Sequence, residues 1–319
     1  MPDPINRVQV FKILRENQRR NGNPMGVEPE VLVDWSKDQR FYSSSTIIYT
    51  GSLYQMMPKA EKFVDLMLKS EMDSRYSLAL RMIGSKTAST LASKLVKEDK
   101  DKSERAKRIL RNASKLLIQN GIDHSYLADD EPYSGILFYD LGLLDQFSDL
   151  ASSAVKIFKE RGVRRIITVD PHSTYAFREL YPKFVEGFDF EVKHYMEVAT
   201  PMKNDKIKGT FAIHDPCVLS RHLSLGEAYR KYIDALGVDY VEPERSGKMT
   251  FCCGGPVESL APAVSSSIAN IRCSQLRDKS KKAVVACPIC LSNLGRCGNI
   301  SSQDKSIEVF DALELTYYG

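Results

Sequence analysis

The stretch KKAVVACPICLSNLGRC, residues 281–297, decides the fold of this chain. Two basic residues precede an apolar run, and a proline then begins a helical pattern, so the stretch predicts a buried strand followed directly by a helix. A second stretch, RRIITVDPHSTYAFREL at residues 164–180, has the same plan. Repetition of a strand and helix unit is typical of α/β proteins with parallel sheets.

An alignment of these two stretches indicates an internal repeat. A further match sets IIYTGSLYQ (47–55) against AIHDPCVLS (212–220). The aligned pairs are Asp170 with Cys287, Ser173 with Cys290, and Ser52 with Cys217. The counterpart of the CCG at 252–254 is MIG at 82–84, a weaker match that rests on one glycine. The chain is therefore interpreted as two copies of one unit, of which only the second carries thiols.

Strands and helices are expected to alternate along most of the chain. The expected strands are residues 45–51, 135–141, 164–170, 190–195, 209–215, 238–242 and 282–287. The expected helices are the first twenty residues, 58–71 with Pro58 in the first turn, 86–98, 103–120, 143–161, 172–181, 224–236, 262–280 and a last one from 288. This pattern predicts an α/β fold of two tandem pseudo-repeat units, with mainly parallel sheets flanked by helices. The expected divisions are a helical lead-in at 1–44, a cysteine-free repeat at 45–200 and a cysteine-rich domain at 205–319.

Composition excludes several classes of protein. Charged residues make up 27% of the 319 residues, and no run of about 18 apolar residues could cross a bilayer, so no direct membrane insertion is expected. The N-terminus lacks the apolar core of a secretory signal, which predicts a cytoplasmic protein and disfavours structural disulfides. The densest charge run, residues 97–108, mixes both signs and predicts a solvated helix face and no nucleic-acid partner.

The cysteines are confined to the last third of the chain. All seven lie at or beyond Cys217, and five fall into three groups. Cys217 is followed after 34 residues by Cys252 and Cys253, and these are followed after 33 residues by the CPIC of Cys287 and Cys290. Loops at the carboxyl ends of parallel strands converge on one edge of a sheet, so this spacing can assemble a single site.

The residues beside these cysteines suit the presentation of thiolates. A disulfide between the neighbours Cys252 and Cys253 would close a strained ring, so an ordinary crosslink is not expected there. Gly254 and Gly255 permit a tight turn in which backbone amides face the sulfurs. Pro288 suits the first turn of a helix, whose N-terminus would stabilise the thiolates of the CPIC.

Soft thiolates favour zinc, copper(I) or an iron–sulfur cluster. A closed zinc site needs four ligands, whereas five clustered thiols fit better around several metal atoms. Two alternatives are cysteines that merely pack as small hydrophobes and a thioredoxin-like CxxC, which leaves Cys217 and the vicinal pair unexplained. Cys273 lies inside an expected helix and is expected to pack and not to ligate, and the role of Cys297 stays open.

The arrangement Cys217, CCGG, CPIC resembles the cysteine-rich CCG domain found in heterodisulfide reductases and in the iron–sulfur subunits of glycolate oxidase, lactate oxidase and anaerobic glycerol-3-phosphate dehydrogenase. GNPMG at 22–26 is also similar to the lead-in of that family. The resemblance implies an iron–sulfur cluster, usually [4Fe-4S], with zinc as the alternative. The ligands that it implies are Cys217, Cys252, Cys253, Cys287 and Cys290.

The first repeat departs from the family pattern. Relatives with disulfide reductase activity have two such sites, but the corresponding residues here are Ser52, Met82, Ile83, Asp170 and Ser173, which cannot hold a thiolate cluster. The ferredoxin-like cysteine runs of some relatives are also missing. The resemblance therefore implies an oxidoreductase subunit of a heterodisulfide-reductase-like complex and not a stand-alone enzyme. It would transfer electrons or assist disulfide and sulfur chemistry at one cluster, with flavoprotein and ferredoxin-like partners. The alternative is a non-redox structural subunit with a zinc-thiolate site.

Three further motifs have weaker interpretations. His214 and His222 flank Cys217, and for each the more common alternative is a loop or core histidine that only packs and hydrogen-bonds. His214 is the candidate to support the cluster as a ligand or as a hydrogen-bond partner of a sulfur. His172, beside Asp170, is expected to have a structural role. GSKTAS at 84–89 lacks the earlier glycine and the leading strand of a phosphate-binding loop, so nucleotide binding is not expected.

Overall fold

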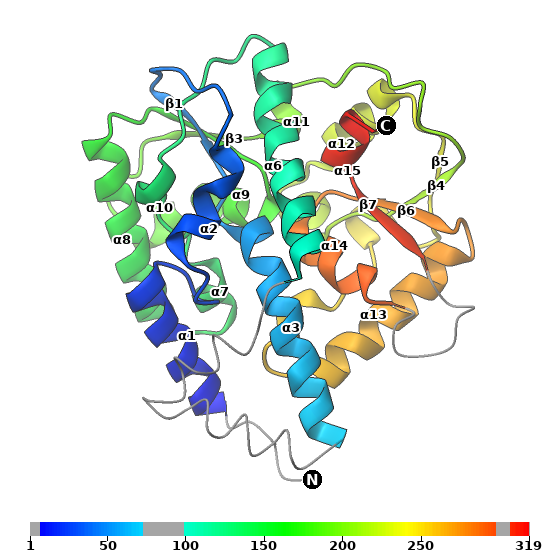
Figure 1. Cartoon of the computed structure of the whole chain (residues 1–319), viewed down its shortest axis with the longest axis horizontal. Coiled ribbons are helices and arrows are strands. Elements are labelled where there is room, and N and C mark those ends of the chain that lie inside the picture. The colour runs from blue at the N-terminus through cyan, green and yellow to red at the C-terminus, as the bar shows by residue number, and fades with distance from the viewer. Residues whose placement is uncertain (1–6, 73–98, 298–306, 319) are drawn as a thin grey trace.

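Two parallel β-sheets, one in each half of the chain, form the framework of the protein (Figure 1). This computed structural model describes residues 7–72, 99–297 and 307–318. The first sheet has the order β1-β2-β3, with strands β1 (Thr46–Tyr49), β2 (Arg165–Thr168) and β3 (Glu191–His194). The second has the order β5-β4-β6-β7, with strands β4 (Phe211–Ile213), β5 (Tyr240–Val241), β6 (Lys282–Val285) and β7 (Glu308–Asp311).

The two sheets have the same internal arrangement. Strand β2 pairs with β3 so that Arg165 lies opposite Glu191, and β6 pairs with β7 so that Lys282 lies opposite Glu308. On the outer side of β1, Ile47 forms a parallel bridge with Ser125, in the position that β5 occupies beside β4. The α/β architecture with parallel sheets, expected from the aligned stretches, is confirmed.

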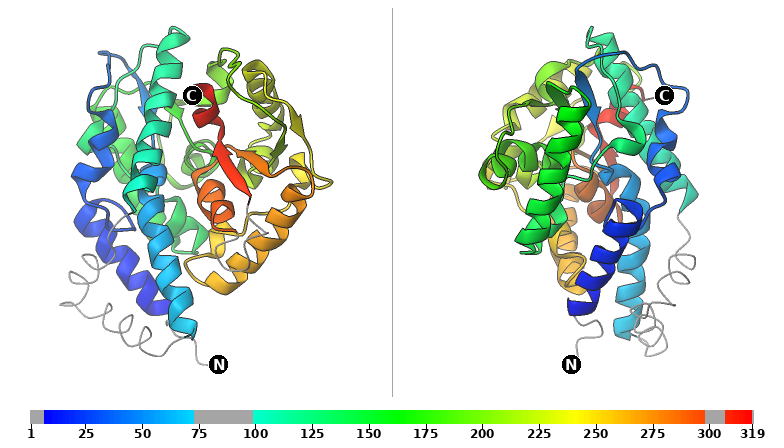
Figure 2. Two further views of the ribbon diagram at one scale, coloured as in Figure 1. Left: turned by 45° about the vertical axis from the view of Figure 1, so that its right-hand side comes forward. Right: turned by 90° about the vertical axis from the view of Figure 1, so that its left-hand side faces the viewer.

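Helices cover the faces of both sheets, as two further views show (Figure 2). Those of the first half are α1 (Arg7–Asn21), α2 (Pro29–Val33), α3 (Leu53–Met72), α6 (Lys100–Gln119), α7 (Ile136–Asp140), α8 (Leu144–Glu160), α9 (Pro171–Tyr175), α10 (Tyr181–Phe184) and α11 (Tyr195–Val198). Those of the second half are α12 (Gly226–Leu236), α13 (Pro262–Arg277), α14 (Pro288–Gly295) and α15 (Ala312–Thr316). Short turns of 3-10 or π-helix complete the structure: η1 (Asp34–Ser36), η2 (Ala128–Asp130), η3 (Ala176–Leu180), η4 (Val218–His222), η5 (Gly247–Met249) and η6 (Gly255–Val257).

The helices that follow β2 and β6 begin in the same way. Asp170 is the N-cap of α9, and its carboxylate accepts a hydrogen bond of 2.8 Å from the Ser173 N–H. Cys287 is the N-cap of α14, and each helix has a proline at its first position. Proline suits that position because the first N–H groups of a helix have no partner within it.

The two halves share one hydrophobic core. Helix α6 buries one face against both sheets, where Ile48 of β1 and Val284 of β6 belong to the same buried cluster. Among the pairs of elements in contact between the halves, α3 packs against α14, and α9 packs against η4. Helix α3 follows β1 and α14 follows β6, whereas η4 follows β4 and α9 follows β2. Each pair therefore joins segments that begin at the carboxyl ends of strands from different sheets. The halves therefore face each other with the carboxyl ends of their strands.

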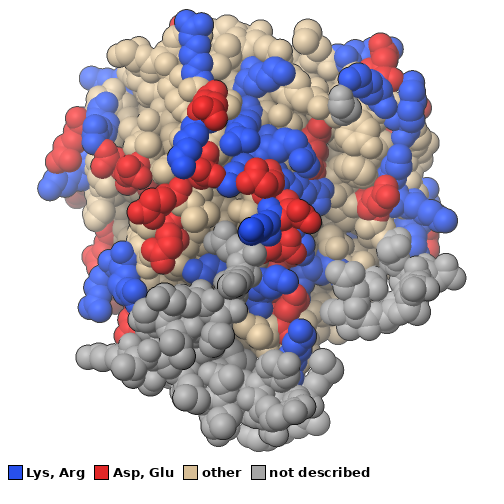
Figure 3. Space-filling view, viewed as in Figure 1, with Lys and Arg blue, Asp and Glu red and all other residues tan. Residues whose placement is uncertain are grey.

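Ion pairs fix α6 to its neighbours across the charged face in Figure 3. Arg105 donates two hydrogen bonds to the Glu314 carboxylate, at 2.8 and 2.7 Å, and Lys102 pairs with Glu61 of α3. Lys and Arg side chains alternate with acidic ones on this face, as expected for the run at 97–108 as far as it is described. In the described residues, no helix is both long enough and apolar enough to cross a membrane.

Several expected elements differ in the structure. Residues 135–141 were predicted as a strand but form α7, which starts after Gly135 in the left-handed region at φ 77°. Helix α3 begins at Leu53, so Pro58 lies in its interior and not in its first turn. The helix expected at 172–181 is α9 and α10 joined by the π-turn η3. The element β7 and the helix α15 were not predicted. The expected helix at 86–98, the MIG and the GSKTAS lie outside the described residues.

Candidate metal centre

Five free cysteines converge from three loops at the carboxyl edge of the second sheet. Cys217 follows β4, the vicinal pair follows β5 and η5, and the CPIC spans the junction of β6 and α14. Cys253, Cys287 and Cys290 are buried, whereas Cys217 and Cys252 are partly exposed. The site thus has a closed inner side and an open outer edge.

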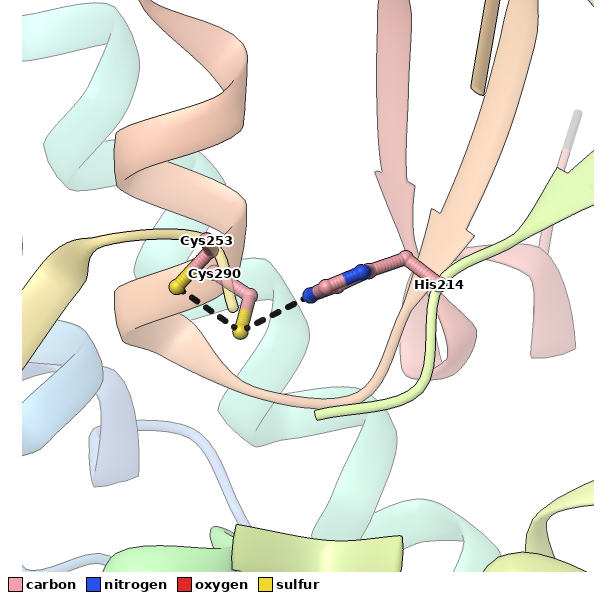
Figure 4. Close-up of side chains that lie close together, drawn as sticks. All are labelled: His214, Cys253 and Cys290. Atoms are coloured by element: carbon pink, nitrogen blue, oxygen red, sulfur yellow. Dashed lines mark hydrogen bonds between the residues drawn. The ribbon is translucent and has the colours of Figure 1, made fainter. Parts of the chain in front are cut away.

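The sulfurs form one connected group. The Sγ atoms of Cys290 and Cys253 are 3.3 Å apart, and His214 Nε2 lies 3.3 Å from Cys290 Sγ (Figure 4). Cys217 interacts with Cys252 at one end of the group, and Cys290 interacts with Cys287 at the other. The convergence predicted from the spacing is therefore present for all five thiols.

The close packing of the sulfurs divides their pKa values into two sets. The Cys217 and Cys253 thiols lower the pKa of Cys252 to about 2. Burial opposes ionisation of Cys287, but the Cys290 thiol and the His172 imidazole beside it hold its pKa well below the ordinary value. The pKa values of the other three cysteines are raised. Cys252 raises the pKa of Cys217, and the adjacent sulfurs together with burial raise those of Cys253 and Cys290. The arrangement thus favours the thiolate, the form that binds metals, at Cys252 and Cys287.

Two glycines present the vicinal pair. The Gly254 N–H donates to Cys252 Sγ at 3.3 Å, and the Gly255 N–H donates to Cys253 Sγ at 3.4 Å. Gly254 has φ +81°, and a Cβ there would lie 2.7 Å from the backbone oxygen of Ser265. The expected orientation of backbone amides toward the sulfurs is therefore present.

Asp215 anchors the loops and was not identified from the sequence. It is fully buried and forms a salt bridge with Arg230, which outweighs its burial and lowers its pKa. Its carboxylate also accepts from the Gly247 N–H at 2.7 Å, and its backbone oxygen accepts from Thr250 Oγ1 at 3.0 Å. Asp215 therefore ties the loop that carries Cys217 to the loop that leads into Cys252. The signal in the sequence was an aspartate placed directly after a strand, in AIHDPC.

His214 and Asn293 support the site from behind. His214 is fully buried, and burial together with the charge of Arg272 lowers its pKa to about 3. Arg272 Nε donates to His214 Nδ1 at 3.1 Å. Asn293, on α14, donates from Nδ2 to the Cys253 backbone oxygen at 2.5 Å. The sequence identified His214 but gave no indication of Arg272 or Asn293.

His172, for which a structural role was expected, lies beside one of the five thiols. Although it belongs to the first half, its buried imidazole interacts with the Cys287 thiol across the junction of the halves. Burial opposes protonation, but the Cys287 sulfur and the nearby carboxylates of Asp140 and Asp170 raise the pKa of His172 to about 9. His222 is exposed, and its ring centroid lies 5.3 Å from that of Tyr175. The junction of the halves therefore brings a residue of the first half to the thiols.

The corresponding position in the first half is filled by its own side chains. Ser173 and Asp170 are fully buried, and a Cβ at Gly51 would lie 2.3 Å from Ser173 Oγ and 3.4 Å from Asp170 Oδ2. Ser52 is buried as well, with φ 56°. Burial raises the pKa of Asp170 to about 6. These groups are hard oxygen donors packed against backbone, and they do not reproduce the thiol group of the second half.

Cys273 and Cys297 form a disulfide and are not among the five free thiols, although they pack in the same buried cluster as Cys253, Cys287 and Cys290. This bond joins α13 to the second residue after the end of α14, with the two Cα atoms 6.5 Å apart. Cys273 was expected to be packed and not to ligate, and it is buried with its sulfur bonded to Cys297. Structural disulfides were not expected, and this prediction is wrong for Cys273 and Cys297. The packing of α13 beside α14 brings the two cysteines, which are 24 positions apart in the chain, within bonding distance.

The donor set fits a thiophilic metal group. Five free sulfurs lie together, two receive backbone N–H groups, and His214 Nε2, Cys253 Sγ and Cys290 Sγ all lie within 4.8 Å of one another. Zinc and iron–sulfur clusters both take thiolates. The arrangement can therefore hold either.

Comparison with known proteins places this site in a recognised domain. Residues 211–295 match the family model of the cysteine-rich domain CCG. The chain is 31% identical over 222 residues to the probable iron-sulfur-binding oxidoreductase FadF of Bacillus subtilis, an alignment that covers 66% of this chain and 31% of that protein. It is 29% identical over 233 residues to the EtfAB:quinone oxidoreductase of Syntrophomonas wolfei, an alignment that covers 67% of this chain and 32% of that protein.

A third relative is part of a heterodisulfide reductase. The chain is 31% identical over 219 residues to one subunit of the dihydromethanophenazine:CoB–CoM heterodisulfide reductase of Methanosarcina acetivorans, covering 63% of this chain and 53% of that subunit. The chain thus spans about a third of the first two relatives and about half of the third. Residues 211–295, which hold all five free cysteines, are thus identified by their match as a cysteine-rich CCG domain.

Proposed function

We propose that this protein is an iron–sulfur redox subunit of a heterodisulfide-reductase-like complex, with one cluster bound in its second half. The observation that carries the proposal is the convergence of five free thiols from three loops. Cys217, Cys252, Cys253, Cys287 and Cys290 are the ligands, and Gly254, Gly255, Pro288 and His214 support them. The cluster is of the [4Fe-4S] type and supplies electron transfer when it is bound.

The division of the chain follows from this assignment. Residues 205–319 form the cluster-binding unit, residues 45–200 form a cysteine-free copy that serves as scaffold and docking surface, and residues 1–44 lead into it. The relatives named for heterodisulfide reduction and for quinone reduction support a role within a larger assembly. Flavoprotein and ferredoxin-like subunits are the partners, the setting is sulfur metabolism, and the compartment is the cytoplasm.

Electrons or a sulfur substrate reach the site at its outer edge. Cys217 and Cys252 are the partly exposed members of the group, whereas the three other thiols are buried. On the inner side, the His172 imidazole from the first half meets Cys287. Electron transfer and disulfide or sulfur chemistry at the cluster therefore take place next to Cys217 and Cys252.

A zinc-thiolate site that only stabilises the fold is the second candidate, favoured by the tetrahedral preference of zinc for cysteine ligands. Five thiols are one more than a closed zinc site takes. The proposal is tested by anaerobic purification of the full chain, followed by measurement of iron, acid-labile sulfide and zinc. We expect iron and sulfide; zinc without sulfide would reject the redox assignment.

A pair of matched serine variants tests the ligand set. Cys253→Ser removes a thiol at the centre of the group and should abolish or alter the electron paramagnetic resonance signal of the cluster. Cys273→Ser removes a sulfur that lies in the disulfide and should leave that signal unchanged. An unaltered signal in Cys253→Ser would remove Cys253 from the ligands.

A further inference from the structure

Arg272 is a fully buried cation that forms no salt bridge within the described residues. Its Nη1 donates to the Arg245 backbone oxygen and to Gln275 Oε1, both at 3.0 Å. Its Nη2 has no hydrogen-bond partner in the part of the chain that the structure describes. Burial lowers the pKa of Arg272 to about 10, so the guanidinium remains charged at neutral pH. A buried charge of this kind needs a nearby opposite charge.

The nearest opposite charges belong to the site itself. The nearby carboxylate of Asp215 is already engaged by Arg230, with Arg230 Nη2 at 3.0 Å from Asp215 Oδ2. The sulfurs of Cys290 and Cys253, which become thiolates when they bind a metal, also act on the Arg272 guanidinium. The positive charge of Arg272 therefore faces the thiols from behind His214.

The hydrogen bond between Arg272 and His214 determines which nitrogen of the histidine carries the proton. Arg272 Nε can only donate, so His214 Nδ1, at 3.1 Å, must present a lone pair. A neutral ring then carries its hydrogen on Nε2, which lies 3.3 Å from Cys290 Sγ. Metal binding through Nε2 would require the hydrogen on Nδ1, where it would point at another donor. His214 is thus placed to donate to a sulfur and not to ligate.

We propose that Arg272 is a positioning residue for the metal centre: it holds His214 as a hydrogen-bond donor to Cys290 and supplies the buried positive charge that offsets the thiolates. This inference rests on the proposed function, because it concerns the cluster assigned there. Donors to a ligating sulfur and nearby positive charge both stabilise the more negative, reduced state of a cluster. Arg272 therefore raises the reduction potential of the cluster. Its positive charge also partly neutralises the negative charge of the buried thiolates.

The first test measures the potential of the full chain, purified anaerobically, by redox titration followed by electron paramagnetic resonance. Arg272→Gln removes the charge, Arg272→Lys keeps the charge but not the planar Nε donor, and Lys279→Gln removes an exposed charge just beyond the same helix. We expect the potential to fall in Arg272→Gln, to fall less in Arg272→Lys and to stay unchanged in Lys279→Gln. Iron and sulfide content should remain near that of the wild type. An equal potential in Arg272→Gln and wild type would overturn the inference.

The second test does not depend on the cluster. In metal-free protein labelled with ¹⁵N-histidine, the ring nitrogen shifts of the five histidines report their tautomers. We expect the Nε2–H tautomer for His214 in the wild type, and an Nδ1–H tautomer would overturn the inference even if Arg272→Gln fails to fold. Absence of iron from the wild-type protein would instead reject the proposed function, and the tautomer would still decide the role of Arg272.

Discussion

Tyr54 and Asp311 are joined by a hydrogen bond of 2.7 Å, although 257 residues separate them in the chain. Tyr54 belongs to α3 of the first half, and Asp311 is the N-cap of α15 in the second. Both side chains are buried, and Asp311 also accepts from the Leu313 N–H at 2.9 Å. The bond therefore fixes the halves to each other through a helix cap.

This cap should make stability depend on pH. Burial raises the pKa of Asp311 to about 7, so the folded protein keeps a proton that the unfolded chain releases near pH 4. The free energy of unfolding should therefore fall as the pH rises from about 4 to about 7, by at most about 1.4 kcal/mol per pH unit from this group. In Asp311→Asn, the amide oxygen can still accept from the Leu313 N–H while the amide NH2 donates to the Tyr54 hydroxyl, and the variant should remove this contribution. Urea unfolding at a series of pH values measures it; Asp189→Asn, at an exposed position, should keep the wild-type slope.

Asp215 and Glu242 provide a matched pair, because both carboxylates bind Arg230. Asp215 is fully buried, so Asp215→Asn should lower the free energy of unfolding by about 3–5 kcal/mol, as expected when a buried ion pair loses one partner. Glu242 is exposed, and Glu242→Gln should cost less than about 1 kcal/mol. Denaturant unfolding compares the two, and iron content should drop only in Asp215→Asn. Equal losses in both variants would contradict the anchoring role of Asp215.

Gly254 should not tolerate a side chain. Its φ of +81° is a backbone conformation that residues with a side chain rarely adopt. An added Cβ would also lie 2.7 Å from the backbone oxygen of Ser265, and relief of that clash would move the vicinal cysteines. Gly254→Ala should lower the free energy of unfolding by about 1–3 kcal/mol and reduce iron content. Gly295, the last residue of α14, is the control because an added Cβ there would meet no atom within 4 Å, and Gly295→Ala should change the stability by less than about 1 kcal/mol. Thermal unfolding and iron analysis of both variants test this difference.

The disulfide should stabilise the fold without affecting the metal centre. Cys273→Ser should cost about 2–4 kcal/mol under non-reducing conditions, because the unfolded chain loses a crosslink. The difference from wild type should shrink in the presence of a strong thiol reductant. Alkylation and mass spectrometry of wild-type and variant protein count the bonded cysteines. A difference that persists unchanged under reduction would show that packing of the thiol, and not the bond, is responsible.

The sequence predicts well the features that are local. A strand followed by proline predicts both β2 with α9 and β6 with α14, and the alignment of Asp170 with Cys287 corresponds to the same N-cap position in both helices. The spacing of the cysteines predicts their convergence because strand ends in a parallel sheet meet at one edge. Gly254 was identified because a turn beside two sulfurs needs its backbone freedom.

Features that depend on packing between distant segments could not be predicted. The contact of His172 with Cys287 exists only because the halves face each other, and no local pattern encodes that orientation. Arg272 lies in a helix with few charges, and an arginine in such a helix is ordinarily expected to be exposed. Its guanidinium is instead buried among groups from other elements. Residues 135–141 are apolar enough for a strand, and burial of Ile136 and Phe138 in a helix produces the same composition.

The shared N-cap position has a consequence for how such sites can change. Asp170 satisfies a backbone N–H at the start of its helix without any metal, in the place where the other half has a thiol. An exchange between carboxylate and thiol at this position therefore leaves the chain path intact. At this one position, the donor atom offered to a metal can therefore change while the helix keeps its start and the half keeps its fold.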